Sequence, residues 1–349
     1  MSGDVSVRLR IAMVAIVVLL PQSVASPSSV RAQLDARGQA GAAARSFLDT
    51  YVDPDGRVVR RDQGGDTVSE GQAYALLLAV AVRDKTRFQR VWSWTTANMQ
   101  RPDSLFAWRW SDGHVVDWMP ASDADLDIAR ALVVAADAFA VPTYRSAGNR
   151  VAAAVLAGET VDIGGRPVLV AGPWARGAPG APVAGILNPS YFSPRTYDEV
   201  SRSTGDLRWG LLAATGRDEV AQLTRTSLPP DWATVDGAGV AKASASPDGR
   251  PPGYGPDAAR LSVRYAEACD APSRSLSAAL WPQLHYAQHR STIGYVGAAG
   301  AASAAGALGE RDQLLAHAED SETQHRTYYG AAWVGLARVM LTTTLLRAC

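Results

Sequence analysis

Apolar residues, many of them alanine and leucine, recur at helical spacing over most of the chain from about residue 42 onward. Because positions three and four residues apart share one face of a helix, this pattern predicts helices rather than strands. About twelve helices with few strands indicate an all-α fold. We expect them near residues 42–52, 69–83, 86–99, 124–140, 144–157, 191–203, 206–224, 257–270, 273–288, 294–307, 310–318 and 324–347.

Two stretches rich in glycine and proline interrupt this pattern, at residues 160–189 and 228–256. The first carries a short β-like segment at residues 167–170, and the second is irregular throughout. Helices of similar character are expected on both sides of each stretch, so we predict a single domain over residues 42–349. Loops of this length inside a compact domain usually have a function.

The N-terminal segment has the layout of a secretory signal peptide over residues 1–25. Two arginines precede an apolar run at residues 11–20, and small residues then suggest cleavage near Ala25 or Ala32. The run is too short to span a bilayer, so we expect a secreted protein with no stable membrane insertion after cleavage. Residues 26–41 show no periodicity and are predicted to be a flexible lead-in.

Charge and cysteine content narrow the possible partners. The 349 residues include 34 Lys+Arg and 34 Asp+Glu, with no basic block in the mature region, which argues against nucleic acid and favours a neutral ligand. We expect a monomer. Cys269 and Cys349 are the only thiols; in an oxidising compartment they can pair, and two buried free thiols are the equal alternative.

Glu70 is the first candidate for chemistry, because it opens an Ala/Leu-rich helical run. An acid in the first turn of a helix is stabilised by the helix dipole and by free backbone N–H groups, and that role alone is common. Here Gly71 leaves room for a ligand near the backbone, while Gln72 and Tyr74 add hydrogen-bonding groups. These neighbours favour a functional acid.

Three aspartates, Asp123, Asp125 and Asp127, alternate at the start of a second helical run. They do not form an EF-hand loop, because Ile128 and Val134 stand where that loop needs glycine and glutamate. Three acids on one entering turn repel one another unless something binds between them, so function is favoured over capping.

A third acid, Asp257, precedes Arg260 by three residues at the start of the helix after the long irregular loop. At this spacing the two side chains share a helix face. They form either a surface ion pair worth under about 1 kcal/mol, or a cleft carboxylate kept ionised by an arginine that also binds a sugar hydroxyl.

Aromatic residues lie close to these acids in the sequence. The chain has ten tryptophans, and Trp108, Trp110 and Trp118 precede the aspartates, while Trp174 and Tyr191 lie in or beside the first irregular stretch. Flat indole faces beside acids suit a polysaccharide cleft, since the apolar faces of sugar rings stack on them. We expect Trp92, Trp94 and Trp333 to be core residues instead.

Other catalytic classes lack their motifs. His285 and His289 are four residues apart without the intervening glutamate of a zinc-protease helix, and there is no Gly-x-Ser-x-Gly or phosphate-binding loop. We therefore expect neither a metal nor a cofactor.

Taken together, these blocks resemble glycoside hydrolase family 8, over roughly residues 42–347. The second block fits the family pattern along its whole length, from Ala121 through Phe139. The matching segments are Ser69-Glu70-Gly71-Gln72-Ala73-Tyr74, Phe106-Ala107-Trp108-Arg109-Trp110, Ala121-Ser122-Asp123-Ala124-Asp125 with Ile128-Ala129-Arg130-Ala131-Leu132, Asn188-Pro189-Ser190-Tyr191-Phe192 and Arg326-Thr327-Tyr328-Tyr329-Gly330.

The resemblance implies an (α/α)6 barrel that hydrolyses β-1,4-glucan internally with inversion. It implies Glu70 as general acid, Asp123 beneath the central sugar with Asp125 as second choice, and Asp257 as general base. An inverting enzyme seats a water between its two carboxyl groups, which then lie ~6.5–9.5 Å apart. We expect substrate contacts from Trp108, Trp110, Asp125, Tyr191, Arg260 and Tyr328.

One departure from the family pattern concerns the base. Pro256 precedes Asp257 where the family often has tyrosine, so Asp198 and Glu199 are substitutes to test. The resemblance also admits chitosanase, mixed-linkage glucanase and xylanase activities, and an enzyme that trims a polysaccharide during its synthesis. A catalytically silent glycan-binding protein and a helical scaffold are the alternatives outside this class.

Overall fold

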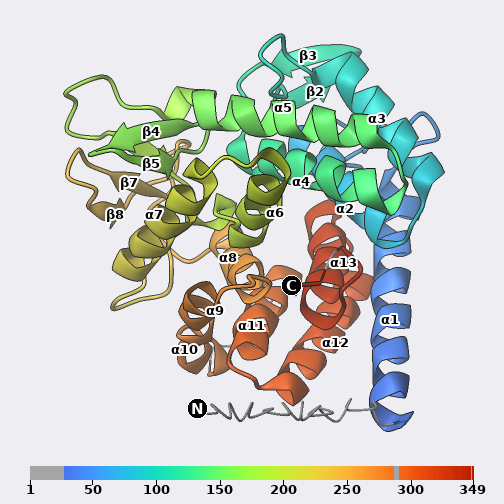
Figure 1. Ribbon diagram of the computed structural model, residues 1–349. Helices are drawn as coiled ribbons and strands as arrows, with labels where there is room; N and C mark the ends of the chain where they lie inside the picture. Colours follow the sequence, from blue (N-terminus) through green and yellow to red (C-terminus); the bar gives the residue numbers. More distant parts are fainter. Residues whose placement is uncertain (1–26, 287–290, 347) are drawn as a thin grey trace, which may run out of the picture.

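The structure is a computed structural model that describes residues 27–286, 291–346 and 348–349 (Figure 1). The predicted signal peptide lies outside the described residues. Helices dominate, as the apolar spacing predicted. They are α1 (Pro27–Tyr51), α2 (Ser69–Ala81), α3 (Lys85–Met99), α4 (Ser122–Ala138), α5 (Pro142–Gly158), α6 (Pro194–Thr204), α7 (Arg208–Leu223), α8 (Pro256–Ala266), α9 (Ala271–Ala278), α10 (Trp281–His285), α11 (Thr292–Ala304), α12 (Leu308–Gln324) and α13 (Tyr328–Thr342), with short 3-10 turns at Pro173–Ala175 and Pro189–Tyr191.

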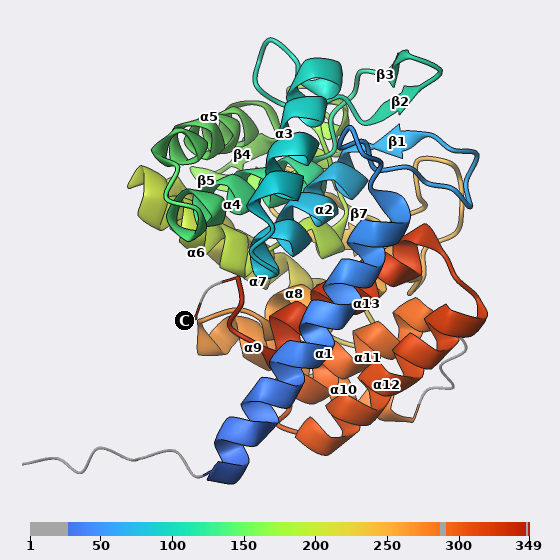
Figure 2. The same cartoon turned by 90° about the vertical axis from the view of Figure 1, so that its right-hand side faces the viewer.

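The helices form an (α/α)6 barrel, which confirms the predicted fold class. Contacts run from α2 to α4, α6, α8, α11, α13 and back to α2, which closes an inner ring. The outer layer is α1 against α13, α3 against α2, α5 against α4, α7 against α6, α9 against α8 and α12 against α11. Figure 2 shows α1 running across the outside of this assembly.

The two layers differ in sequence because they differ in burial. Along α2 every residue except Glu70 is buried, and α4 is buried from Ser122 to Ala136. A helix enclosed on all sides needs apolar or small residues all round. Outer helices such as α3 bury only one face, in this case through Phe88, Val91 and Met99. Acidic side chains that reach the centre of the barrel therefore come from the inner helices.

The prediction of a flexible lead-in without periodic structure is wrong for residues 27–41, because Pro27–Tyr51 is one continuous helix. Its first turns are exposed, and burial begins at Ala40, where α1 packs along α13. This part is rich in alanine, arginine and glutamine, which have high intrinsic helix propensity, so it extends the packed helix with few tertiary contacts, such as the hydrogen bond from Arg338 to Gln39.

Two further helix boundaries differ from the prediction. The expected helix at 273–288 is divided into α9 and α10, with Pro282 in the first turn of α10. Proline cannot donate the backbone hydrogen bond that would continue α9. The helix expected at 310–318 extends to Gln324, because the polar surface residues of α12 are good helix formers.

The two irregular stretches come together in the structure. Strand β6 (Gly185–Leu187) pairs antiparallel with β7 (Ala233–Val235), which pairs with β8 (Ala241–Ala243). A hairpin of β4 (Thr160–Ile163) and β5 (Arg166–Leu169) adjoins α7. A third sheet joins β1 (Thr67–Val68), β2 (Arg109–Ser111) and β3 (His114–Asp117). These small sheets place the loops around the starts of the inner helices.

Cys269 and Cys349 form a disulfide, which resolves the two alternatives left by the sequence. It ties the C-terminal end to the turn after α8. Of the helices in the described ranges, none combines the length and apolar character needed to cross a bilayer.

Candidate active site

Glu70 lies in the first turn of α2, with 20% of its side chain exposed. Its Oε1 accepts hydrogen bonds from the Tyr74 hydroxyl at 2.7 Å and from Nη1 of Arg260 at 2.6 Å. Loss of solvation raises the pKa of Glu70 to about 7, and the nearby Asp123 adds to this effect, although Arg260 opposes it. A carboxyl group with this pKa is available as a proton donor near neutral pH.

Arg260, on α8, connects the three acids that the sequence singled out. Its guanidinium group is fully withdrawn from solvent at 1% exposure. Nη1 lies 2.6 Å from Glu70 and 3.0 Å from Oδ2 of Asp123, and Nη2 lies 3.3 Å from Oδ1 of Asp257. The Asp257–Arg260 pair is therefore part of a buried cluster, and the surface ion pair alternative is wrong.

The three alternating aspartates have three separate partners, which explains how they coexist on one turn. Asp123 accepts hydrogen bonds from Arg260. Asp127 forms two 2.8 Å bonds with Arg264, both residues being 1% exposed. Asp125 is fully buried, and its Oδ1 accepts from the backbone N–H of Phe106 at 3.0 Å. Asp125 does not face the cleft, so the prediction that it binds substrate is wrong.

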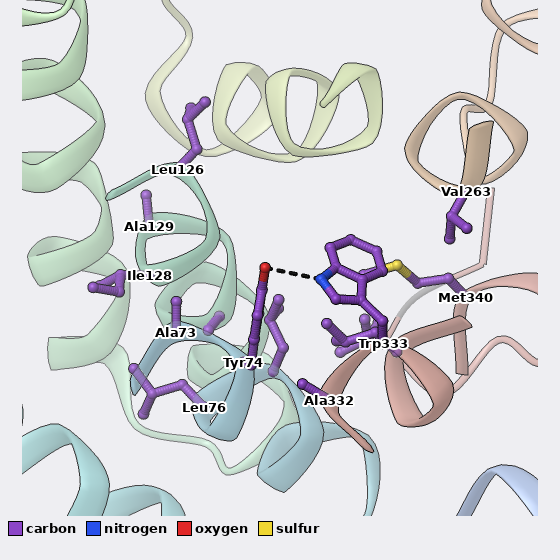
Figure 3. Packing of buried hydrophobic residues seen from close by; sticks show 14 of the residues in the cluster. Ala73, Tyr74, Leu76, Leu126, Ile128, Ala129, Val263, Ala332, Trp333 and Met340 are labelled. Carbon is purple, nitrogen blue, oxygen red and sulfur yellow. Dashed lines mark hydrogen bonds between the residues drawn. The ribbon is translucent and has the colours of Figure 1, made fainter. Parts of the chain in front are cut away.

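Tyr74 lies one turn beyond Glu70 on α2 and links it to the barrel core. Besides Glu70, its hydroxyl contacts Arg260 at 3.0 Å and accepts a 3.0 Å hydrogen bond from the indole N–H of Trp333. Figure 3 shows the Tyr74 ring directed toward Trp333 among buried residues of α2, α4 and α13. Trp333 is fully buried, as expected of a core residue. The orientation of Glu70 is therefore set by packed aromatic rings.

Asp257 is held from both sides at the start of α8, with 27% of its side chain exposed. Asn188 donates to its Oδ2 at 2.9 Å. The helix start has no side-chain cap of its own, and Asp231 supplies one from the loop before it, accepting from the N–H groups of Gly255 at 3.1 Å and Ala258 at 2.7 Å. The carboxylate thus reaches the cleft from a fixed helix end.

An aromatic cavity of about 410 Å³ adjoins the acids. Trp108, Trp174, Tyr191 and Trp232 line it, and the Trp232 ring centroid lies 6.2 Å from both Trp174 and Tyr191. The guanidinium group of Arg260 lies 5.3 Å from the Tyr191 ring, which joins the cavity to the acid cluster. Trp232 was missed from the sequence, where its only signal was its place in the long irregular loop.

Two aromatic residues predicted to bind substrate are elsewhere. Trp110 is covered on one face by Arg57, with 4.5 Å between guanidinium and ring centroid, and packs edge-on against Trp94. Tyr328 is 1% exposed, and its ring packs against Phe47 and Tyr51. The prediction for Tyr328 is wrong because its ring is buried in the core. Trp110 is half-buried with Arg57 over one ring face, so its contact with substrate stays a prediction.

The next residue, Tyr329, takes the place expected for Tyr328. Its ring lies 5.8 Å from the Arg260 guanidinium. The room beside Gly71 also belongs to Tyr328, since a Cβ at Gly71 would lie 2.5 Å from its hydroxyl oxygen. Gly71 therefore admits a tyrosine, and the prediction that it admits a ligand is wrong.

Neither substitute for Asp257 reaches the cleft. Glu199 is fully buried in ion pairs with Arg195 at 2.8 Å and Arg130 at 3.4 Å. Asp198 pairs with Arg202 at 2.7 Å. Both acids neutralise arginines on or beside α6, away from Glu70.

A larger cavity of about 520 Å³ lies between α7 and the β4–β5 hairpin, with no aromatic lining residue. Glu219 lines it at 2% exposure, and burial raises its pKa to about 8. Within the described ranges, no group of three or more His, Cys, Asp or Glu side chains could hold a metal ion. The three acids around Arg260, beside the aromatic cavity, are thus the best candidates for catalysis.

Comparison with known proteins agrees with this geometry. The family model described as Glycosyl hydrolases family 8 matches residues 21–333. A probable endoglucanase of Novacetimonas hansenii is 36% identical over 225 residues, which are 63% of this chain and 64% of that protein. An endoglucanase of Cellulomonas uda is 29% identical over 198 residues, 53% of this chain and 52% of that protein. The matched part thus spans less than two thirds of either relative.

A solved structure covers more of the chain. The endo-beta-1,4-glucanase CMCax from Acetobacter xylinum superposes with a TM-score of 0.72 at 27% sequence identity, covering 87% of this chain and 98% of that one. The similarity therefore extends over most of this chain.

Proposed function

Because this chain belongs to glycosyl hydrolase family 8, we propose that it is an inverting endo-β-1,4-glucanase that cleaves cellulose-type chains. The observation that carries the proposal is the contact of one buried guanidinium group, that of Arg260, with Glu70, Asp123 and Asp257. The names of the relatives, endoglucanase and endo-beta-1,4-glucanase, support this choice of substrate.

In the proposed reaction, Glu70 protonates the glycosidic oxygen as the bond to the anomeric carbon breaks. Asp257 accepts a proton from the water that attacks the opposite face of that carbon. Asp123 lies beneath the sugar and stabilises the positive charge that develops on the ring. Each turnover adds one water and leaves Glu70 ionised and Asp257 protonated, and proton exchange with solvent restores both groups.

The electrostatics suit these different roles. Desolvation raises the pKa of Glu70 to about 7, and burial also raises the pKa of Asp123, although Arg260 opposes this effect; Arg260 contacts Asp257 as well. Two carboxyl groups whose surroundings separate their proton affinities are the usual arrangement of an acid and a base. Arg260 between Glu70 and Asp257 also keeps the two carboxyl groups out of direct contact, which favours the wider spacing of inverting enzymes.

The aromatic cavity is the proposed binding site for the glucan chain. Trp174 is 39% exposed and Trp108 is 37% exposed, so their ring faces are accessible for stacking on sugars. A silent glycan-binding protein would gain nothing from an acid of raised pKa held beside two further carboxyl groups on one buried arginine. The buried cluster therefore favours an enzyme over a binding protein.

We also propose that the protein is exported and acts as a monomer. Disulfides persist mainly in oxidising compartments, and the Cys269–Cys349 bond supports export together with the N-terminal pattern. Size-exclusion chromatography with light scattering tests the monomer.

Reducing-sugar release on carboxymethylcellulose, mixed-linkage glucan, xylan and chitosan tests the activity and the substrate. We expect the highest activity on carboxymethylcellulose and a loss of about 10³-fold in Glu70→Gln. Glu219→Gln is the matched control, because it removes another buried acid outside the cleft. If the enzyme prefers xylan, chitosan or mixed-linkage glucan, the proposed substrate is wrong and the proposed roles of the acids are unaffected. If the protein binds these glycans but hydrolyses none of them, the proposal that it is an enzyme is contradicted.

A further inference from the structure

Two carboxyl groups outside the proposed catalytic set face each other beneath the cleft wall. Asp125 belongs to the first turn of α4, and Glu159 directly follows α5. Both are fully buried at 0% exposure. Within the described part of the chain, no N–H or hydroxyl group donates to Oδ2 of Asp125 or to either oxygen of Glu159. The partner left for these atoms is the other carboxyl group, which lies close enough to affect the pKa of each acid and to form a hydrogen bond with it.

Such a bond requires a proton, because two ionised carboxylates have none to share. Burial raises the pKa of Asp125 and of Glu159 well above the ordinary range. Asp125 raises the pKa of Glu159 further, whereas the hydrogen bond with Glu159 lowers the pKa of Asp125. Asp123 and Asp103 add further negative charge, and Arg101 is the nearby cation that interacts with both members of the pair. One proton is the minimum that allows a hydrogen bond between the two acids, and it leaves a single negative charge on the pair.

The other oxygen of Asp125 connects this pair to the cleft. Oδ1 accepts the backbone N–H of Phe106, and the segment continues through Ala107 to Trp108, whose ring lines the aromatic cavity. The carbonyl oxygen of Trp108 accepts a 3.0 Å hydrogen bond from the N–H of Ser69, the residue before Glu70. A continuous set of contacts therefore runs from Glu159 through Asp125 to the cleft wall and to the start of α2.

We propose that Asp125 and Glu159 are positioning residues that share one proton, and that this proton fixes the Phe106–Trp108 segment against α4. The inference rests on the proposed function, because it takes the aromatic cavity to be the substrate site. Neither residue touches substrate. Their effect is on the position of Trp108, and hence on the KM for the glucan.

The proposal predicts a specific response to alkaline pH. Loss of the shared proton leaves two negative charges in a fully buried site, where like charges repel strongly. Oδ2 of Asp125 then lacks its donor, and the segment carrying Trp108 loses its anchor. The KM of the wild-type enzyme should therefore rise at alkaline pH.

Two substitutions of Glu159 separate proton sharing from simple packing. In Glu159→Gln, the amide group donates to Asp125 without any shared proton, so we expect the wild-type KM at neutral pH and no rise of KM at alkaline pH. In Glu159→Leu, Asp125 loses its donor, so we expect KM to rise about tenfold at neutral pH. In Glu219→Gln, another buried acid is removed, and we expect the KM of the wild type at every pH.

The proposal is overturned if KM in Glu159→Gln rises with pH as in the wild type, or if Glu159→Leu keeps the wild-type KM. If Glu159→Leu does not fold, the pH dependence of KM in Glu159→Gln and in the wild type still tests the proposal. A second readout needs no activity: the free energy of unfolding of the wild type should fall more steeply with rising pH than that of Glu159→Gln, because the folded wild type holds an extra proton. If the free energy of unfolding falls equally steeply with pH in the wild type and in Glu159→Gln, the shared proton is contradicted. If the slopes differ but the wild type hydrolyses no glucan, only the proposed function is contradicted.

Discussion

The hydroxyl oxygen of Tyr74 lies 2.7 Å from Oε1 of Glu70, one helical turn earlier on α2. This hydrogen bond favours the ionised carboxylate and lowers the pKa of Glu70, against the larger effect of desolvation. Trp333 fixes the tyrosine in turn, through its indole N–H at 3.0 Å. The proton affinity of the proposed acid is therefore tuned, among other effects, by a tyrosine that is itself held by the core.

Tyr74→Phe should shift the pH dependence of the enzyme. Removing the hydroxyl raises the pKa of Glu70, so the acid stays protonated to higher pH. The alkaline limb of kcat/KM should move upward, while kcat at the optimum falls about tenfold because the carboxyl group is less well oriented. The measurement is a pH profile of kcat/KM on a soluble β-glucan. An alkaline limb that moves downward would contradict the assignment of Glu70 as the acid.

Arg260→Gln should lower both activity and stability. The substitution leaves Asp123 and Glu70 without their shared cation, and breaking a buried ion pair costs about 3–5 kcal/mol. The acids then take up protons more readily, so their folded-state pKa values rise and stability returns as pH falls. Urea unfolding should show a larger deficit at pH 7 than at pH 5.

The matched control for this substitution is Arg202→Gln. Arg202 pairs with Asp198 at the surface, where the arginine side chain is 49% exposed, and such pairs contribute at most about 1 kcal/mol. A deficit in Arg260→Gln that is as small as in the control, or that does not change with pH, would speak against the buried cluster.

Trp232→Ala should weaken substrate binding. The ring lies between Trp174 and Tyr191 in the aromatic cavity, so its loss should raise the KM for cello-oligosaccharides about tenfold with a smaller effect on kcat. Trp118→Ala is the control, because Trp118 is 53% exposed and does not line the cavity. Equal KM values for the two variants would remove this cavity from the substrate path.

The double variant Cys269→Ser, Cys349→Ser should be less stable and still active. The disulfide closes a sequence separation of 80 residues, and loss of such a bond costs about 2–5 kcal/mol. Neither cysteine contacts the aromatic cavity, so kcat/KM at 25 °C should stay within about twofold of the wild type. Thermal unfolding with and without reductant measures the effect, and a melting temperature insensitive to reductant would contradict it.

Much of the fold follows from local patterns. Apolar spacing and helix-forming residues predicted most helices to within a few residues, since burial of an inner helix leaves little freedom in composition. Glu70, Asp123 and Asp257 were predicted as site residues, and the structure gathers them around Arg260. Acids at helix starts are visible in sequence because the apolar run follows them directly.

Other parts of the site depend on contacts distant in sequence or on the rotation of a helix. Successive helical residues differ by ~100° in direction, so Tyr328 points into the core while Tyr329 reaches Arg260. Asp125 lies on α4 and Glu159 directly follows α5, and no local pattern pairs them. Trp232 lies in an irregular loop whose position comes from the pairing of β6 with β7.

Glu70 is proposed to donate the proton to the leaving group, so the effect of removing it should depend on how much protonation the leaving group needs. The decisive measurement is kcat/KM of Glu70→Gln on a β-1,4-glucan and on a dinitrophenyl cello-oligosaccharide, whose leaving group needs no protonation. We expect a loss of about 10³-fold on the glucan and a much smaller loss on the activated substrate. Equal losses on both substrates would contradict this role of Glu70.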